Sequence, residues 1–173
     1  MAETRLPEPW LRGTLQDVPP VTRAVLHALE LAKEDLARWC HPLSDEELNT
    51  QPHGVASVAF QICHIARSVD RLLTYAEGKE LDEQQLRLLA EESIRSPTRV
   101  TLFEELRETL NYATSRIRRF DPATLNEPRT VGRKRLPTTV AGLLIHVADH
   151  TQRHVGQAIT TAKVVKGIKP DGH

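Results

Sequence analysis

The chain has 173 residues, 39% of them hydrophobic and 27% charged, which fits one globular domain able to bury a core without disulfides. Lys plus Arg and Asp plus Glu both number 23, so the net charge apart from histidine is zero, and no block of like charge favours nucleic-acid binding. No stretch approaches the ~18 apolar residues of a membrane span, and the N-terminal MAETRLPEPW is unlike a signal peptide. We therefore expect a cytoplasmic protein without nucleic-acid or membrane partners.

Cys40 and Cys63 form no CxxC pair and are predicted to be buried thiols.

The first part of the chain is predicted to form an arm followed by a long helix. Residues 1–20 contain four prolines and should not make a long helix; Trp10 and Leu11 are expected to pin this arm onto the body. From Val21 to Pro42, apolar residues recur at three- and four-residue steps, as one face of an amphipathic helix requires. This stripe consists of Val25, Leu29, Ala32, Leu36 and Trp39.

Capping patterns mark the next two helices. Ser44 followed by Glu47 is a capping box, in which each side chain bonds the other's free backbone donor, and it predicts a short helical turn. A second long helix is predicted from Ser57, its N-cap, to Glu77, with Gly78 ending it. Its core stripe is Val58, Ile62, Ile65, Val69 and Leu72.

A more polar helix and a third long helix are predicted to follow. Residues 81–95 have a helical pattern that Pro97 ends. Thr101 with Glu104 forms a second capping box, which predicts the start of the third long helix. Its stripe is Leu102, Leu106, Leu110, Ala113, Ile117 and Phe120.

The connection to the last helix is predicted to lack strands. Asp121 followed by Pro122 indicates an N-cap and the first position of another short turn. The basic stretch Arg129 to Arg135 (RTVGRKR) interrupts the helical pattern and is predicted to be a solvated loop. No segment alternates between apolar and polar residues for long enough to predict a strand.

The last helix is predicted to begin at Thr138 or Thr139 and to run to about Val165, closed by Gly167 and Pro170. Four long amphipathic helices with polar connections define the predicted fold class as all-α, a four-helix bundle with short extra helical turns. The predicted organisation is an N-terminal arm over residues 1–20, the bundle over 21–167 and a tail over 168–173.

Histidine is the residue type that carries a functional signal in this chain, which has eight. Four of them are predicted to be structural or solvent-facing, because they are terminal, flank prolines or lack a matched partner: His27, His41, His53 and His173. The segment HVADHTQRH places His146, His150 and His154 at four-residue steps on the last helix. Histidines four apart lie about 6 Å apart along the axis and can converge on one metal ion.

Two pairs of these histidines could bind a metal ion, His146 with His150 or His150 with His154, and their angular positions around the helix distinguish them. Val140, Leu143, Val147, Ala158 and Thr161 occupy an arc of roughly 60°. His150 and His154 fall inside or beside this arc and are expected to point into the bundle. His146 falls outside it, toward Asp149 and Arg153 on the wetter flank. Two adjacent inward imidazoles would repel if charged and need polar partners if neutral, and a metal ion answers both requirements.

Other interpretations of this pair stay open at the level of sequence. The two histidines could be satisfied separately, by Asp70 or by backbone carbonyls. The pair is not a zincin site, because Thr151 stands where HExxH has its glutamate, and no Glu-x-x-His of a di-iron bundle occurs. A third ligand must come from another helix, and His64, in the apolar setting AFQICHIARSVDRLL, is the candidate. Three histidines would leave coordination positions open, as catalytic sites do.

These motifs resemble the DinB/YfiT-like family of bacterial four-helix metal proteins. Residues 57–71 (SVAFQICHIARSVDR) are similar to the family's second helix, which carries one ligand histidine, and residues 146–157 (HVADHTQRHVGQ) to its terminal helix. The resemblance covers about residues 20–165 and assigns the ligands to His64, His150 and His154, with His146 not ligating. The tryptophan that many relatives carry before the second helix is replaced by the stretch 53–56.

The resemblance implies an up-up-down-down bundle, often a homodimer, that binds one divalent ion. Zinc and nickel are the ions that it implies first. It further implies a metal-dependent enzyme of the thiol S-transferase or hydrolase type, acting on a small molecule such as a low-molecular-weight thiol. Such an ion can lower the pKa of a bound water to about 7 or hold a thiol as thiolate. Asp70 and Asp149 are candidates to orient the ligands, and Arg67 to bind an anionic substrate group. The alternatives are a non-enzymatic, stress-related bundle that binds metal or a small molecule, and a structural protein without metal.

Overall fold

The computed structural model describes residues 6–92 and 96–167. Its elements, in chain order, are η1 (Pro9–Leu11), α1 (Pro20–Trp39), α2 (Asp45–Asn49), η2 (Pro52–Gly54), α3 (Val58–Ala76), α4 (Glu83–Glu91), α5 (Arg99–Ile117), η3 (Pro122–Thr124), β1 (Pro128–Val131), β2 (Leu136–Thr139) and α6 (Val140–Lys166). The predicted tail with Pro170, the end of the predicted helix 81–95 and the first five residues of the arm lie outside the described residues.

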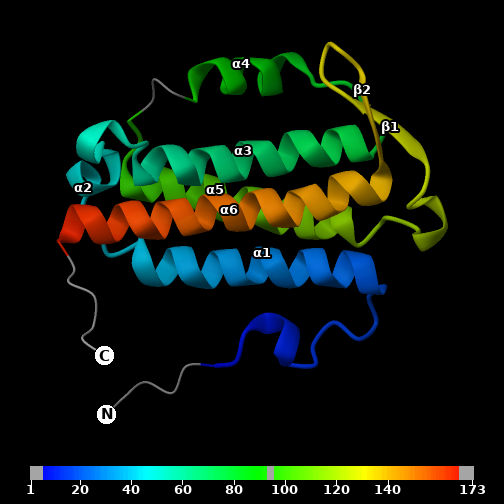
Figure 1. The fold of residues 1–173 in the computed structure, drawn as a ribbon, viewed down its shortest axis with the longest axis horizontal. Helices are drawn as coiled ribbons and strands as arrows, with labels where there is room; N and C mark the ends of the chain where they lie inside the picture. Colours follow the sequence, from blue (N-terminus) through cyan, green and yellow to red (C-terminus); the bar gives the residue numbers. More distant parts are fainter. Residues whose placement is uncertain (1–5, 93–95, 168–173) are drawn as a thin grey trace.

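The four long helices α1, α3, α5 and α6 lie side by side (Figure 1). Helix α6 packs between α1 and α3, and α5 contacts both α3 and α1 on the other side, so the four surround one core. The predicted apolar stripes supply most of this core, which includes the fully buried Leu29, Leu36, Ile62, Ile65, Leu102, Leu110 and Ile117. Leu144 of α6, outside the predicted stripes, is fully buried as well. No helix in the described part of the chain is long and apolar enough to cross a bilayer.

The chain passes through these helices in the order up, down, down, up, and not in the implied up-up-down-down order (Figure 1). Helices α3 and α5 are parallel, as shown by the ion pair Arg67–Glu105 toward their beginnings and the pair Glu77–Arg116 at their ends. The physical reason is α4, which lies along α3 and carries the chain back to the end of the bundle where α3 began.

Most of the predicted helix boundaries are confirmed. The capping box of Ser44 and Glu47 opens α2, and the Ser57 hydroxyl accepts the Phe60 N–H at the start of α3. The N-cap of α5, however, is Thr98 and not Thr101. Because Pro97 precedes it directly, helix α5 begins one turn earlier than predicted, and the Thr98 hydroxyl accepts the Thr101 N–H.

The end of α6 matches the prediction closely. Thr139 is the N-cap, and its hydroxyl accepts the N–H of Gly142. At the other end Gly167 takes the left-handed conformation, with a φ of 62°, which lets its N–H reach the carbonyls of the last turn. Helix α6 therefore spans the whole length of the bundle and presents the stretch His146–His154 at its middle (Figure 1).

A short β-hairpin occupies the stretch that the sequence predicted as a loop without strands. Strands β1 and β2 are antiparallel, with Pro128 opposite Thr139 and Val131 opposite Leu136. Gly132 and Arg135 have φ values of 68° and 48°, which close the turn between them. Strands of four residues are too short to display a period-two pattern, so the prediction was wrong here.

The N-terminal arm is not held by the two residues predicted to pin it. The side chains of Trp10 and Leu11 are 61% and 57% exposed. The Arg12 guanidinium instead donates to both carboxylate oxygens of Glu34, at 2.6 and 2.7 Å, and to Glu30 at 3.2 Å on α1. A bidentate arginine–carboxylate pair fixes geometry better than a single apolar contact at a surface does.

Candidate metal centre

Helices α3 and α6 bring together the three histidines that the sequence singled out. His64 lies mid-way along α3, and His150 and His154 are one turn apart on α6. One ring nitrogen from each of the three lies within 4.8 Å of the others. The Nε2 atoms of His64 and His150 are 3.4 Å apart, and two ligands of a tetrahedral ion at ~2.0–2.1 Å are separated by about 3.4 Å.

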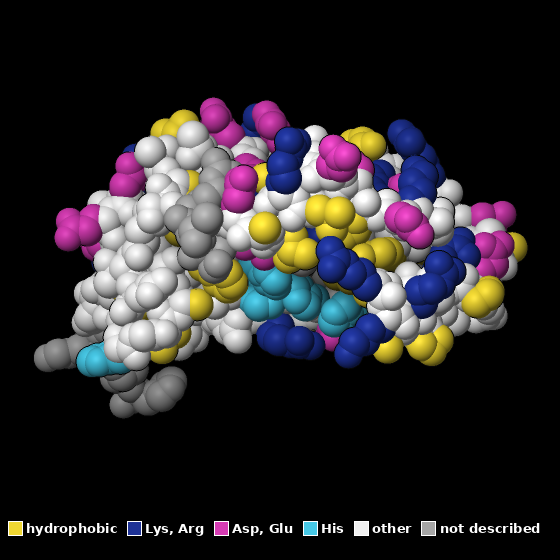
Figure 2. All heavy atoms as spheres, turned by 90° about the horizontal axis from the view of Figure 1, so that it is seen from above, with side chains coloured by type: hydrophobic (Ala, Val, Ile, Leu, Met, Phe, Trp, Pro, Cys, Tyr) yellow, Lys and Arg dark blue, Asp and Glu magenta, His cyan; other side chains and the backbone are white. Residues whose placement is uncertain are grey.

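The histidines form an open cluster on one face of the molecule. Figure 2 shows their side chains gathered at the centre of this face, between a hydrophobic area and several basic side chains. All three are half-buried: the helices cover their bases, while the ring edges reach the surface. A small molecule can therefore approach the cluster from solvent.

Each of the three rings has a hydrogen-bond partner at Nδ1, on the side away from the cluster. His64 Nδ1 lies 2.8 Å from Glu92 Oε2, and His154 Nδ1 lies 2.6 Å from Gln61 Oε1. His150 Nδ1 lies 3.4 Å from the Ser68 hydroxyl, a longer contact. These partners, and not Asp70 or a backbone carbonyl, satisfy the outer nitrogens.

The partners determine which nitrogen carries the proton. A carboxylate and an amide oxygen only accept, so His64 and His154 donate from Nδ1–H. The Ser68 hydroxyl donates its own hydrogen to the carbonyl of His64, at 2.5 Å, so it accepts from His150 Nδ1–H. The Nε2 atoms of the three rings then carry no proton and can serve as ligand atoms, and outer hydrogen bonds at Nδ1 are the feature that orients metal-binding histidines.

Electrostatics keep the two histidines of α6 neutral. Burial, followed by the nearby His154 and His64, lowers the pKa of His150 to about 4. Burial and His64 likewise lower the pKa of His154. Because a metal ion binds the neutral imidazole, no proton has to be displaced from either ring near pH 7.

Glu92 is a residue of the candidate site that sequence reasoning missed. It follows the end of α4, its side chain is 6% exposed, and its second oxygen accepts from Arg71 on α3 at 2.6 Å. Both carboxylate oxygens are thus engaged, so Glu92 orients His64. Nothing in the sequence sets Glu92 apart from the other acids of its segment, because its role depends on α4 lying over α3. Gln61 and Ser68, by contrast, stand three residues before and four after His64, a helical spacing that could have identified them.

His146 lies beside the cluster. Its ring centroid is 5.2 Å from that of His150, and its Nδ1 pairs with the exposed Asp149 at 2.8 Å. Asp149 also accepts from Arg153 at 3.3 Å. Asp149, a candidate to orient the ligands, therefore pairs with His146 and Arg153 on the flank of α6 and, in the part of the chain that the structure describes, with none of the three clustered histidines. Of the other histidines, His27 is buried against the Thr14 hydroxyl.

Asp70 and Arg67 have partners away from the histidines. The Asp70 carboxylate accepts from Arg116 at 2.7 Å and from Gln85 at 2.5 Å, which joins α3 to α5 and α4. Arg67 is buried and donates to Glu105 at 2.8 Å and to the carbonyl of Leu88. Both side chains therefore join α3 to α4 and α5.

The fold and the cluster define a helical bundle with three converging histidines on two of its helices. A model of the DinB superfamily matches residues 28–158, which is more than half of the chain and includes all three histidines. The chain therefore belongs to the DinB superfamily. Comparisons with curated proteins and with solved structures gave no match.

Proposed function

We propose that this chain binds one divalent metal ion through Nε2 of His64, His150 and His154, and that it is a metal-dependent enzyme acting on a small molecule. The observation that supports this most directly is the set of Nδ1 contacts to Glu92, Ser68 and Gln61. Histidines that each had an unrelated structural role would have no reason to have all their hydrogen-bond partners at the same ring nitrogen, Nδ1. The donor set of three neutral imidazoles suits zinc or nickel.

Three protein ligands leave coordination positions for a substrate, which distinguishes catalytic from structural sites. A divalent ion held here supplies Lewis-acid chemistry, which suits either thiol S-transfer or hydrolysis. The protein itself contributes fixed imidazole positions, through the outer hydrogen bonds, and access from one face (Figure 2). We propose a low-molecular-weight thiol as the first substrate class to test.

One observation favours the alternative of a bundle that binds metal or a small molecule without catalysis. Glu92 is the carboxylate in contact with the cluster, and Arg71 and His64 engage both of its oxygens. It is therefore not free to act as a general base.

A screen of thiol transfer and of ester and amide hydrolysis decides between these functions. The protein is assayed metal-free, loaded with zinc or nickel, and as His154→Ala under the same conditions. An enzyme shows turnover in the loaded protein that is lost in the other two samples. Metal uptake without turnover on any substrate class would support the binding protein instead, and turnover that persists without metal would contradict the proposal.

A further inference from the structure

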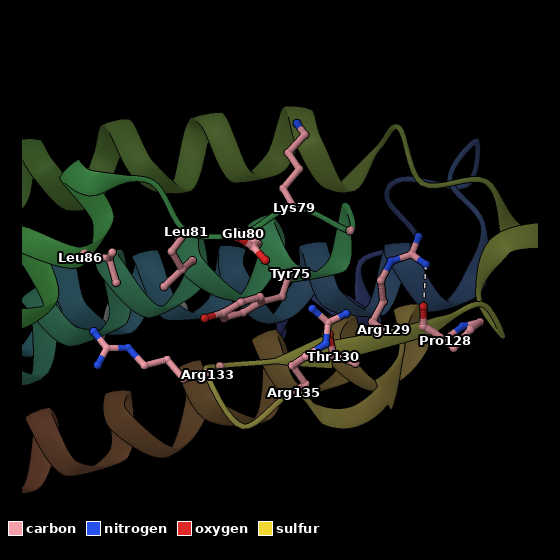
Figure 3. Close-up of a pocket in the computed structure, with 12 residues that line it drawn as sticks. Tyr75, Lys79, Glu80, Leu81, Leu86, Pro128, Arg129, Thr130, Arg133 and Arg135 are labelled. Carbon is pink, nitrogen blue, oxygen red and sulfur yellow. Dashed lines mark hydrogen bonds between the residues drawn. The ribbon is translucent and has the colours of Figure 1, made fainter.

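A cavity of about 710 Å³ lies outside the histidine cluster. It is bounded by the C-terminal end of α3, the segment that leads into α4 and the β1–β2 hairpin (Figure 3). Pockets of roughly 300–1,000 Å³ are typical for small organic ligands.

One wall of this cavity is apolar. Tyr75 of α3, Leu81 before α4 and Leu86 of α4 line it, and Figure 3 shows their side chains turned to the same space. Leu86 is 44% exposed although it is a large aliphatic residue on an amphipathic helix. An aromatic ring beside two leucines offers a surface for the carbon skeleton of an organic molecule.

The opposite wall carries two guanidinium groups without carboxylate partners. Arg133 and Arg135 stand in the hairpin turn and line the cavity, and no ion pair of either occurs among residues 6–92 and 96–167. Arg129, which also lines it, is structural, since its guanidinium donates to the Ala76 carbonyl and to Glu127. The two free guanidinium groups are suited to a carboxylate or a phosphate.

Two further charged residues border the cavity. Lys79 pairs with Glu77 at 2.9 Å and points away from the enclosed space in Figure 3. Glu80 is the acidic residue of the lining and opposes an anion. The free charge facing the cavity is therefore two positive groups against one negative group, which retains a net attraction for an anion.

The cavity and the histidine cluster both lie along helix α3, which carries Tyr75 and His64. Helix α4 contributes Leu86 to the cavity, and Glu92 just past its end contacts His64; six residues of helix rise about 9 Å. Figure 3 shows the Arg133 side chain extending from the hairpin toward the side of the cavity on which Leu86 lies. Tyr75 and His64 lie on the same helix, about 16 Å apart along its axis, so a molecule must be about 16 Å long to span both places.

We propose that this cavity binds the anionic end of an elongated organic substrate, whose apolar middle lies on Tyr75 and Leu86 and whose reacting end reaches the histidines. The last part rests on the proposed function, whereas binding of the anion in the cavity does not. Carboxylate and phosphate share the chemistry that Arg133 and Arg135 recognise, so both are tested.

Binding is measured by titration calorimetry with 4-phenylbutyrate, 4-phenylbutyl phosphate and the neutral 4-phenylbutyramide as probes. The full chain and its His150→Ala variant should bind one or both anions with equal affinity, and the amide at least tenfold more weakly. Arg133→Gln should weaken anion binding about tenfold. Lys134→Gln, the matched control, removes the same charge from the same turn outside the cavity lining and should change affinity less than twofold. Glu80→Gln should strengthen binding.

Three results would overturn the assignment: no saturable binding of either anion, equal binding of the amide, or equal weakening by Lys134→Gln and Arg133→Gln. Loss of anion binding in His150→Ala would place the anion at the histidines and also overturn it. Failure of the chain to bind metal would refute the proposed function alone, because the anion titrations do not depend on metal.

Discussion

At the scale of single residues, Glu92 is the side chain on which the orientation of His64 depends. Its carboxylate bridges His64 and Arg71 from the end of α4, and it is almost fully buried. We expect Glu92→Ala to weaken zinc binding by about 10–100-fold, because a ligand histidine that loses its outer hydrogen bond loses both tautomer and orientation. Competition with a chromophoric chelator measures the affinity.

Glu91→Ala is the matched control for this variant. Glu91 is the exposed neighbour of Glu92 at the last position of α4, and its removal takes away the same charge. Its zinc affinity should stay within about twofold of the unchanged protein, because an exposed carboxylate is screened by solvent. Equal losses in both variants would show that only net charge matters and that Glu92 does not orient His64.

The lowered pKa of His150 predicts how stability depends on pH in the metal-free protein. In the unfolded chain its pKa returns to about 6.5, whereas burial and the neighbouring His154 lower the pKa to about 4 in the fold. Between these values the unfolded state binds the proton and the folded state does not, so stability falls as pH falls from about 6.5 to 4. Thermal unfolding of the protein and of His150→Gln across this range measures the contribution, and the variant should show the shallower slope. The prediction would be contradicted if the stability of the protein and that of His150→Gln changed equally with pH.

At the scale of elements, α5 is joined to α3 by the buried guanidinium of Arg116. It donates to Glu77 at 2.6 Å, to Asp70 at 2.7 Å and to the Thr74 hydroxyl at 3.1 Å. Replacing one partner of a buried ion pair leaves the others without compensation. We expect Arg116→Ala to lower the free energy of unfolding by about 2–4 kcal/mol, measured by urea denaturation.

Arg118→Ala provides the comparison for Arg116→Ala. Arg118 caps the same end of α5, and its pair with Asp17 is exposed, with side chains 40% and 74% accessible. Its removal should cost less than about 1 kcal/mol, because an exposed ion pair contributes little in water. A similar loss in both variants would show that the junction of α3 and α5 does not depend on Arg116.

At the scale of the whole molecule, the helices and the inward pair His150 and His154 were predictable from local periodicity, whereas His64 was identified by its apolar setting and by the family resemblance. A stripe such as Leu29, Ala32 and Leu36 repeats within one helix, and the phase of His150 and His154 follows from the 3.6-residue turn. These features need no knowledge of how distant segments meet. The same rule places His146 on the flank of α6, where its ring lies beside the cluster and pairs with Asp149.

The features that could not be predicted depend on how separate segments pack. The chain order of the bundle follows from α4 returning along α3, and the polar sequence of α4 does not encode that position. Glu92 becomes a partner of His64 only through the same packing. The hairpin is stabilised by pairing between residues such as Val131 and Leu136 on its two strands. Strands of four residues are too short to show an alternating pattern from which this pairing could be predicted.

Cobalt binding by the metal-free protein, followed by the d–d absorption of the ion, shows whether His64, His150 and His154 hold one metal ion together. We expect one equivalent of cobalt per chain, with the absorption of a four- or five-coordinate ion. This absorption should be lost in His64→Ala, His150→Ala and His154→Ala and kept in His146→Ala, which is the same change on the same helix as the last two. Retention of the spectrum in any of the first three variants, or its loss in His146→Ala, would contradict the assignment of the site.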